Sequence, residues 1–122
     1  MGKRILIVDD SLVARLILRD ILESGGHKVI AEASSGEEAV TKYNELMPDL
    51  VIMDIVLPNK NGIDAADEIL SMDRRAKIII ISVLDDIPLI QAAFTIGAID
   101  FIHKPFHPAK VLEVVQNVSK IS

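Results

Sequence analysis

The sequence predicts an α/β domain in which helices cover both faces of a parallel β-sheet. Short apolar runs alternate with amphipathic runs along the chain, and each kind occurs five times. The apolar runs are continuous and rich in β-branched residues, which is typical of strands buried on both faces of a parallel sheet. This alternation implies right-handed crossovers and a three-layer sandwich. The pattern does not by itself reveal the order of the strands.

Length and composition narrow the class of protein. A chain of 122 residues, half of them hydrophobic, fits a single domain over residues 1–122 with a full core. The absence of cysteine excludes disulfides, zinc fingers and thiol catalysis. A net charge of −5 and few aromatic residues argue against a nucleic acid partner. No apolar run has the length of a signal peptide or membrane span, so we expect a cytoplasmic protein without membrane insertion.

The five expected strands are short apolar runs, and the stretches between them have helical patterns. The strands are expected at residues 5–8, 29–33, 50–53, 78–81 and 99–102. In the first helix one buried face is expected from the spacing of its apolar residues: Ala14, Ile17, Leu18, Ile21 and Leu22. Ser35 and Glu38 have capping-box spacing and open the second helix, which ends before Pro48. The other helices are expected at residues 64–72, 88–96 and from 108 onward.

Polar side chains follow four of the five strands. Asp9 and Asp10 follow the first strand, and Asp54 follows the third. Ser82 follows the fourth strand, and Lys104 comes shortly after the fifth. Each residue alone has an ordinary structural explanation, such as a helix cap, a turn or a solvated lysine. Because the carboxyl ends of parallel strands share one edge of the sheet, we expect these side chains to converge on one pocket.

Three carboxylates in one pocket repel one another, and a hard divalent cation removes that conflict. Mg²⁺ prefers carboxylate oxygens, water and phosphate oxygens. We therefore expect Asp10 and Asp54 to bind Mg²⁺ directly and Asp9 to hold a metal-bound water. Lys104 would then meet a second anion, to which Ser82 would donate a hydrogen bond. These groups are the ones needed to form an aspartyl phosphate.

At these residues the sequence resembles the receiver domain of bacterial and archaeal two-component response regulators. It is most similar in character to the single-domain, CheY-like regulators of chemotaxis. The resemblance runs essentially end to end and is carried by VDD at 8–10, MDIVLPNKNG at 53–62, IISV at 80–83 and DFIHKPF at 100–106. It implies a flavodoxin-like (CheY-like), doubly wound sheet of five parallel strands in the order 2-1-3-4-5 with five flanking helices. It also implies a cis peptide bond between Lys104 and Pro105.

The resemblance further implies a role for each position. Asp54 is the phosphoacceptor, which takes a phosphoryl group from a CheA-like histidine kinase. Lys104 pairs with that phosphoryl group, and Ser82 and Phe101 form a switch that changes the surface of helix 4, strand 5 and helix 5 for a downstream protein target. The chain is then a signalling switch and not a turnover enzyme. The implied Mg²⁺ ligands are Asp9, Asp10, Asp54 and the main-chain carbonyl of Val56.

Three departures from the family pattern give further expectations. Phe101 has no hydroxyl, so it either acts by packing alone or is an ordinary core aromatic. Val56 and Leu84, two positions beyond Asp54 and Ser82, are apolar and cannot orient an attacking water, which predicts slow self-dephosphorylation.

Apolar residues outside the expected buried faces suggest docking surfaces. In the first helix Leu12 and Leu16 lie off the inward stripe, which suggests a site for a kinase or phosphatase. The fourth helix is apolar nearly all round, and Ile90 and Phe94 on it suggest a target or dimer face. Packing of these residues against loops is an equally good explanation.

Three other functions fit the same fold class. A Mg²⁺-dependent phosphatase with an aspartate nucleophile usually has two acids spaced two apart after the first strand, whereas here they are adjacent. A nucleotide or flavin binder would need a glycine-rich phosphate loop, which the sequence lacks. A pure interaction module would not need the complete set of acids and lysine. Whether the chain is a stand-alone regulator or the receiver part of a longer one stays open.

Overall fold

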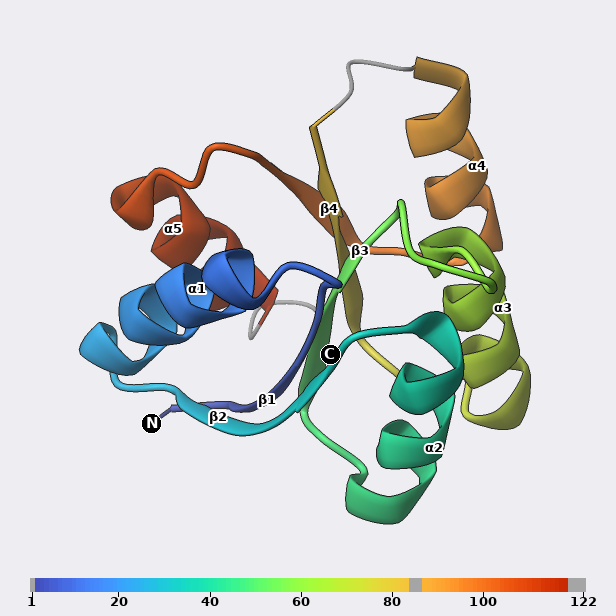
Figure 1. The fold of residues 1–122 in the computed structure, drawn as a ribbon, viewed down its shortest axis with the longest axis horizontal. Coiled ribbons are helices and arrows are strands. Elements are labelled where there is room, and N and C mark those ends of the chain that lie inside the picture. Colours follow the sequence, from blue (N-terminus) through green and yellow to red (C-terminus); the bar gives the residue numbers. More distant parts are fainter. Residues whose placement is uncertain (1, 84–86, 119–122) are drawn as a thin grey trace.

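The computed structural model describes residues 2–83 and 87–118, in which five strands alternate with five helices (Figure 1). The strands are β1 Arg4–Val8, β2 Lys28–Ala33, β3 Leu50–Asp54, β4 Ile78–Ser82 and β5 Asp100–His103. The helices are α1 Leu12–Ser24, α2 Gly36–Leu46, α3 Gly62–Met72, α4 Ile87–Ile96 and α5 Pro108–Val118. Every strand and helix expected from the sequence is present. Among these helices, none has both the length and the apolar character needed to cross a membrane.

The strands form one parallel sheet in the order β2-β1-β3-β4-β5. This confirms the predicted α/β class and the strand order implied by the resemblance. Helices α1 and α5 cover one face of the sheet, and α2, α3 and α4 cover the other (Figure 1). The chain therefore changes its winding direction between β1 and β3, the point at which open α/β sheets bind their ligands.

Each face of the sheet has its own hydrophobic core, because successive strand residues point to opposite sides. In β1, Leu6 and Val8 pack toward α2, α3 and α4, while Ile5 and Ile7 pack toward α1 and α5. All residues of β3 and β4 are buried. This double coverage explains why these strands are continuous apolar runs and do not alternate with polar residues.

Side-chain caps decide where the helices begin. Ser11 caps α1, with its hydroxyl oxygen accepting a hydrogen bond from the N–H of Ala14 at 3.1 Å. Asn61 caps α3 in the same way, with Oδ1 accepting from the N–H of Asp64 at 2.9 Å. The expected start of α3 at Asp64 was therefore two residues too late. Asn61 and Gly62 look like turn residues in the sequence, but an asparagine is also a strong helix cap.

One residue expected in the core of α1 is exposed. The buried residues of this helix are Leu18, Ile21 and Leu22, whereas 47% of Ile17 is accessible to solvent. Ile17 lies about 100° around the helix from Leu18, so it falls on the flank of α1 and does not face the sheet. The prediction that Ile17 is buried was wrong.

Candidate functional site

The two acidic strand ends lie side by side. Strands β1 and β3 are neighbours, and their register pairs Val8 with Met53. The next residues along the two strands are Asp9 and Asp54, so both carboxylates leave the sheet at the same edge. This adjacency follows from the strand order and from nothing local in the sequence.

The other two polar residues reach the same edge from β4 and β5. Ser82 is the last residue of β4 and pairs with His103 of β5. Lys104 comes next, and its main-chain N–H donates to the carbonyl oxygen of Ser82 at 3.1 Å. The peptide bond between Lys104 and Pro105 is cis, as the resemblance implied.

Three carboxylates gather at this edge. Asp9, Asp10 and Asp54 each have an oxygen within 4.8 Å of those of the other two. Asp9 and Asp54 are buried, with 1% and 7% of their surfaces exposed, whereas Asp10 is exposed. Several negative charges this close, two of them out of water, repel strongly unless positive charge accompanies them.

Lys104 supplies part of that positive charge. Its Nζ atom lies 2.6 Å from Oδ2 of Asp9 and 3.0 Å from Oδ2 of Asp54. Only 20% of the lysine side chain is exposed, so most of it is withdrawn from bulk water. A lysine that the sequence alone would place on the surface is therefore part of a partly buried ion cluster.

The cluster changes the pKa values of both partners. Burial raises the pKa of the Asp54 carboxyl, and the nearby Asp9 raises it further, while the Val56 N–H and the Lys104 ammonium lower it. The net result is a pKa above the usual carboxyl value. Burial lowers the pKa of the Lys104 ammonium, but the close contacts with the Asp9 and Asp54 carboxylates and their charges outweigh it, so this pKa is raised.

The donor set fits a hard divalent cation. All the side chains in the cluster, apart from Lys104, offer carboxylate oxygens, which Mg²⁺ prefers. Within the described residues, the buried Oδ2 of Asp9 receives no well-directed hydrogen bond, although the ammonium of Lys104 is close. One ammonium, in contact with two of the three carboxylates, leaves net negative charge and unused lone pairs at the site.

The loop after β3 is held tightly below Asp54. The N–H of Val56 donates to Oδ1 of Asp54 at 3.0 Å, and the N–H of Gly62 donates to the carbonyl of Ile55 at 2.7 Å. A Cβ atom at Gly62 would lie only 1.9 Å from the main-chain oxygen of Asp54. This position therefore requires glycine. The turn residues of the sequence predicted a loop here, but they did not predict that Gly62 lies so close to the main chain of Asp54.

Arg15 is a contributor to the site that sequence reasoning missed. Its Nη1 donates to the main-chain oxygen of Asp9 at 2.6 Å. The main-chain N–H of Ser11 donates to Oδ1 of the same aspartate at 2.9 Å. Arg15 looks like any other helical arginine in the sequence, since its contact depends on how the β1–α1 loop folds back.

The expected switch residues lie on the two neighbouring strands β4 and β5, where Phe101 pairs with Ile80. Ser82 is buried, with 5% of its surface exposed. Phe101 is half-buried on β5, between two rings with which it makes edge-to-face contacts. Its centroid is 6.2 Å from that of Phe94 on α4 and 4.9 Å from that of His103. Phe101 thus links the surface of α4 to β5, next to the strand that carries Ser82.

Comparison with known protein families agrees with this geometry. A profile of the family described as "Response regulator receiver domain" matches residues 5–116. The chain belongs to the response regulator receiver domain family. Members of this family are phosphorylation switches of two-component signalling and not turnover enzymes, which confirms these two predictions from the sequence.

Individual receiver domains resemble this one closely. The chemotaxis protein CheY of Thermotoga maritima is 50% identical over 98% of this chain and 100% of its own length. CheY of Bacillus subtilis is 46% identical over 94% and 96%, respectively. Among solved structures, a complex of CheX and CheY with BeF3 and Mg²⁺ from Borrelia burgdorferi contains a chain that is 36% identical. It superposes with a TM-score of 0.91, covering 98% of this chain and 90% of the other.

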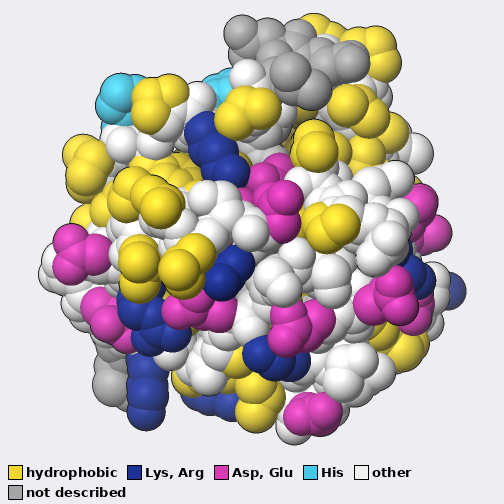
Figure 2. All heavy atoms as spheres, in the orientation of Figure 1, with side chains coloured by type: hydrophobic (Ala, Val, Ile, Leu, Met, Phe, Trp, Pro, Cys, Tyr) yellow, Lys and Arg dark blue, Asp and Glu magenta, His cyan; other side chains and the backbone are white. Residues whose placement is uncertain are grey.

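The receiver domain also has two exposed apolar surfaces. On α1, Leu12 and Leu16 are 59% and 53% exposed, and Ile17 extends this surface. On α4, Phe94 is 39% exposed and Ile90 is half-buried. Figure 2 shows hydrophobic side chains gathered over both helices, with charged side chains between them. Leu12, Leu16 and Phe94 are therefore not fully covered by the described part of the chain, whereas Ile90 is partly covered. Leu84, named above for its effect on dephosphorylation, lies outside the described residues.

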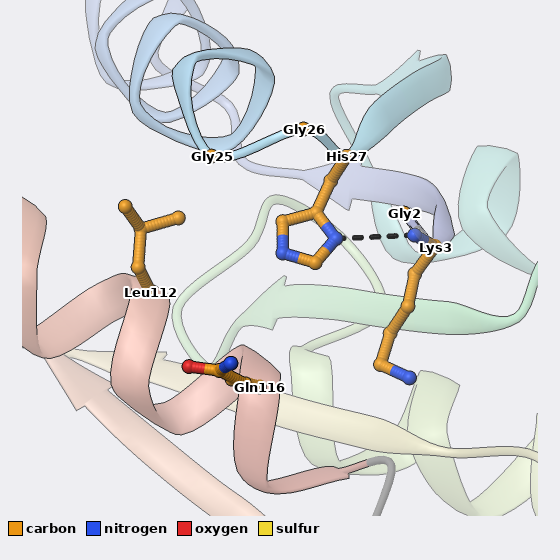
Figure 3. A pocket seen from close by; sticks show the side chains of 7 residues that line it. All are labelled: Gly2, Lys3, Gly25, Gly26, His27, Leu112 and Gln116. Carbon is orange, nitrogen blue, oxygen red and sulfur yellow. Dashed lines mark hydrogen bonds between the residues drawn. The ribbon is translucent and has the colours of Figure 1, made fainter.

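A separate hollow of about 560 Å³ lies at the opposite edge of the sheet of the receiver domain (Figure 3). His27 lines it, and its Nδ1 accepts a hydrogen bond from the N–H of Lys3 at 3.1 Å. Burial lowers the pKa of this imidazole, and the charge of Lys3 adds to the effect. Among the described residues, those that line the hollow include no carboxylate, so the lining differs in chemistry from the aspartate cluster.

Proposed function

We propose that this chain is a CheY-like, cytoplasmic signalling switch that accepts a phosphoryl group on Asp54 from a CheA-like histidine kinase. The single observation that carries the proposal is the position of Asp54. Its carboxylate lies at the winding switch of the sheet, within reach of the Lys104 ammonium and beside Asp9 and Asp10. The similarity to chemotaxis proteins over nearly the whole chain supports a role in chemotaxis.

Mg²⁺ is the proposed cofactor. Asp10 and Asp54 would bind it directly, Asp9 would hold a water on the ion, and the main-chain carbonyl of Val56 would be a further ligand. When bound, the ion neutralises negative charge that develops on the transferring phosphoryl group. The mutual proximity of the three carboxylates supports this assignment, as does the presence of Mg²⁺ in the similar complex from Borrelia burgdorferi.

The residues of the chain then perform the transfer. An oxygen of Asp54 attacks the phosphorus of a phosphohistidine in line with the P–N bond. The new O–P bond forms as the P–N bond breaks, and the histidine of the kinase keeps the electron pair and takes up a proton. Lys104 pairs with an oxygen of the phosphoryl group. It is already fixed within 3.0 Å of Asp54, so little reorganisation is needed.

The phosphoryl group shifts the population of two surface states. The Ser82 hydroxyl donates a hydrogen bond to it, and Phe101 moves into the space near β4. Because Phe101 contacts Phe94, this movement changes the packing of α4 against β5. The surface formed by α4, β5 and α5 thereby gains affinity for a downstream protein. Phe101 has no hydroxyl, so the coupling is one of packing alone.

Two surfaces are proposed for partners. The kinase, or a phosphatase, docks on Leu12 and Leu16 of α1, which are exposed next to the Asp9–Asp10 loop. The target, or a second copy, docks on Ile90 and Phe94 of α4. The Borrelia burgdorferi relative that assembles with CheX supports the idea that such a protein presents a docking surface. Alanine at Leu12 and Leu16 is expected to weaken kinase or phosphatase binding while leaving labelling by a small phosphodonor unchanged.

The decisive experiment is mass spectrometry after incubation with acetyl phosphate. The wild-type chain is expected to gain one phosphoryl group in the presence of Mg²⁺ and none when the metal is chelated. Asp54→Asn should gain none under either condition, while Asp49→Asn, at an exposed aspartate before β3, should behave as wild type. Labelling that persists in Asp54→Asn would show that the acceptor is another residue. Repeated turnover of small phosphomonoesters would instead identify a phosphatase.

A further inference from the structure

Arg15 connects the acidic pocket to β2. Its Nη1 donates to the main-chain oxygen of Asp9 at 2.6 Å, and its Nε donates to Oε1 of Glu32 at 2.8 Å. The side chains of Arg15 and Glu32 are only 15% and 23% exposed. One guanidinium therefore links the end of β1, the first turns of α1 and the neighbouring edge strand. A partly buried arginine with two directed contacts is a rigid support.

The hydrogen bond from Arg15 to the Asp9 carbonyl affects the position of Asp10, the next residue along the chain. The N–H of Asp9 donates to the carbonyl of Ala33 at 3.0 Å, and its Oδ1 accepts from Ser11. The carbonyl of Asp9 belongs to the peptide unit that leads to Asp10. Fixing the direction of that carbonyl fixes the peptide plane and hence the point from which the Asp10 side chain leaves the chain. Within residues 2–83 and 87–118, the Asp10 carboxylate has no hydrogen bond of its own to hold it.

The positive charge of Arg15 is also neutralised by nearby carboxylates. A lone arginine close to the carboxylates would repel a divalent cation. Glu32 cancels that charge, and Glu32 is itself held by Arg19, whose Nη2 lies 2.6 Å from Oε2. Arg19 in turn meets Glu23 at 3.4 Å. Two positive and two negative side chains thus form a network without net charge, so Arg15 positions the pocket without opposing the cation.

We propose that Arg15 is a positioning residue for cation binding: by holding the Asp9 carbonyl against Glu32, it keeps the Asp10 carboxylate in place for Mg²⁺. This inference rests on the proposed function, because it assumes that the carboxylates bind Mg²⁺. Groups that orient metal ligands typically contribute about 10- to 100-fold to metal affinity or activity. Since Arg15 acts through the main chain, the lower end, about tenfold, is expected.

The chain contains a matched control. Arg19 lies one helical turn after Arg15, and its Nε bonds the same glutamate at 2.8 Å, but it has no hydrogen bond to Asp9. Arg15→Gln and Arg19→Gln therefore both remove a guanidinium from Glu32. Only Arg15→Gln frees the Asp9 carbonyl. A purely structural role for Arg15 predicts the same result for the two variants.

The test is calorimetric titration of the full chain with Mg²⁺, alongside urea unfolding. Arg15→Gln should raise the Kd for Mg²⁺ about tenfold, whereas Arg19→Gln should leave it within about twofold, although both variants lose stability. The ¹⁵N chemical shift of the Asp10 amide should change in Arg15→Gln only. Arg15→Lys should restore part of the affinity, because an ammonium can reach the carbonyl but cannot form both directed contacts.

Each outcome is decisive. Equal Mg²⁺ affinity in Arg15→Gln and Arg19→Gln overturns the inference and leaves the proposed function intact, provided that the wild-type chain binds Mg²⁺. Failure of the wild-type chain to bind Mg²⁺ overturns both. If Arg15→Gln does not fold, Arg15→Lys is compared with Arg19→Lys in the same titration. A higher Kd in Arg15→Lys alone supports the inference, and equal values reject it.

Discussion

The ammonium of Lys104 lies 3.0 Å from a carboxylate oxygen of Asp54, although the two residues are 50 positions apart in the chain. Strand β4 separates β3, which ends with Asp54, from β5, which Lys104 follows. The same ammonium lies 2.6 Å from Asp9, so one positive charge serves two buried carboxylates. This shared ion pair keeps the acids together before any cation or phosphoryl group arrives.

Removal of that charge should therefore affect both stability and phosphorylation. In Lys104→Gln, Asp9 and Asp54 are left without their common positive partner. The free energy of unfolding without Mg²⁺ should fall by about 1–3 kcal/mol, as measured by urea unfolding. The rate of Asp54 phosphorylation by acetyl phosphate should fall about 100-fold, since the charge on the phosphoryl group loses one partner.

Lys110→Gln is the control for this prediction. Lys110 is a lysine with 66% of its side chain exposed, paired with Glu113 on α5. Its removal should change the free energy of unfolding by less than about 0.5 kcal/mol and leave the phosphorylation rate unchanged. Equal effects of the two substitutions would show that Lys104 has no special role.

Mg²⁺ should stabilise the chain through the three aspartates. A ligand that binds only the folded state adds RT ln(1 + [L]/Kd), or about 2.7 kcal/mol at a concentration 100 times the Kd. For a domain of this size, that corresponds to a rise in Tm of about 10 °C. Differential scanning calorimetry should show this rise in the wild-type chain and lose it in Asp10→Asn. Asp20→Asn, an exposed acid on α1, should keep it.

The stability of the folded chain should depend on pH through the carboxyl group of Glu32. Burial raises the pKa of its carboxyl, but the hydrogen bonds and charges of Arg19 and Arg15 outweigh it, so the pKa lies below the usual value. The folded state therefore binds this proton less readily than the unfolded state. The stability that Glu32 contributes is full above the unfolded pKa of about 4.3 and is lost as the pH falls through the lower folded value.

The comparison of wild type with Glu32→Gln isolates this contribution. Urea unfolding at neutral pH should show a less stable variant, and the difference should shrink steadily below about pH 4. The same comparison for Glu45→Gln, an exposed glutamate on α2, should show little difference at any pH. A Glu32→Gln difference that stays constant into the acid range would contradict the role assigned to Arg15 and Arg19.

The phosphorylated form should be long-lived. Val56 is 57% exposed and lies two residues beyond Asp54, where an apolar side chain cannot orient an attacking water. Val56→Asn should shorten the half-life of phospho-Asp54 several-fold, and adding Leu84→Glu should shorten it further. Val56→Ile, which stays apolar, should leave the half-life unchanged. Decay followed by mass spectrometry measures all of these, and identical half-lives would refute the prediction.

Local features of the structure were predictable from the sequence. The strands and helices follow from apolar periodicity, and the cap of α2 follows from the spacing of Ser35 and Glu38, where the hydroxyl oxygen accepts from the N–H at 3.1 Å. The carboxyl ends of parallel strands lie at one edge of the sheet. This rule was enough to predict a common location for Asp9, Asp54, Ser82 and Lys104. Each of these inferences needs only neighbours along the chain or a general rule of sheet geometry.

The remaining features depend on which distant segments meet, and the sequence by itself did not determine them. The placement of β1 beside β3, which makes Asp9 and Asp54 neighbours, came only from family resemblance until the sheet order was seen. The exposure of Ile17 depends on how far α1 is covered, and the contact between Arg15 and the Asp9 carbonyl depends on a loop that folds back. Periodicity acts over a few residues, whereas these contacts arise from long-range packing, so only the tertiary structure decides them.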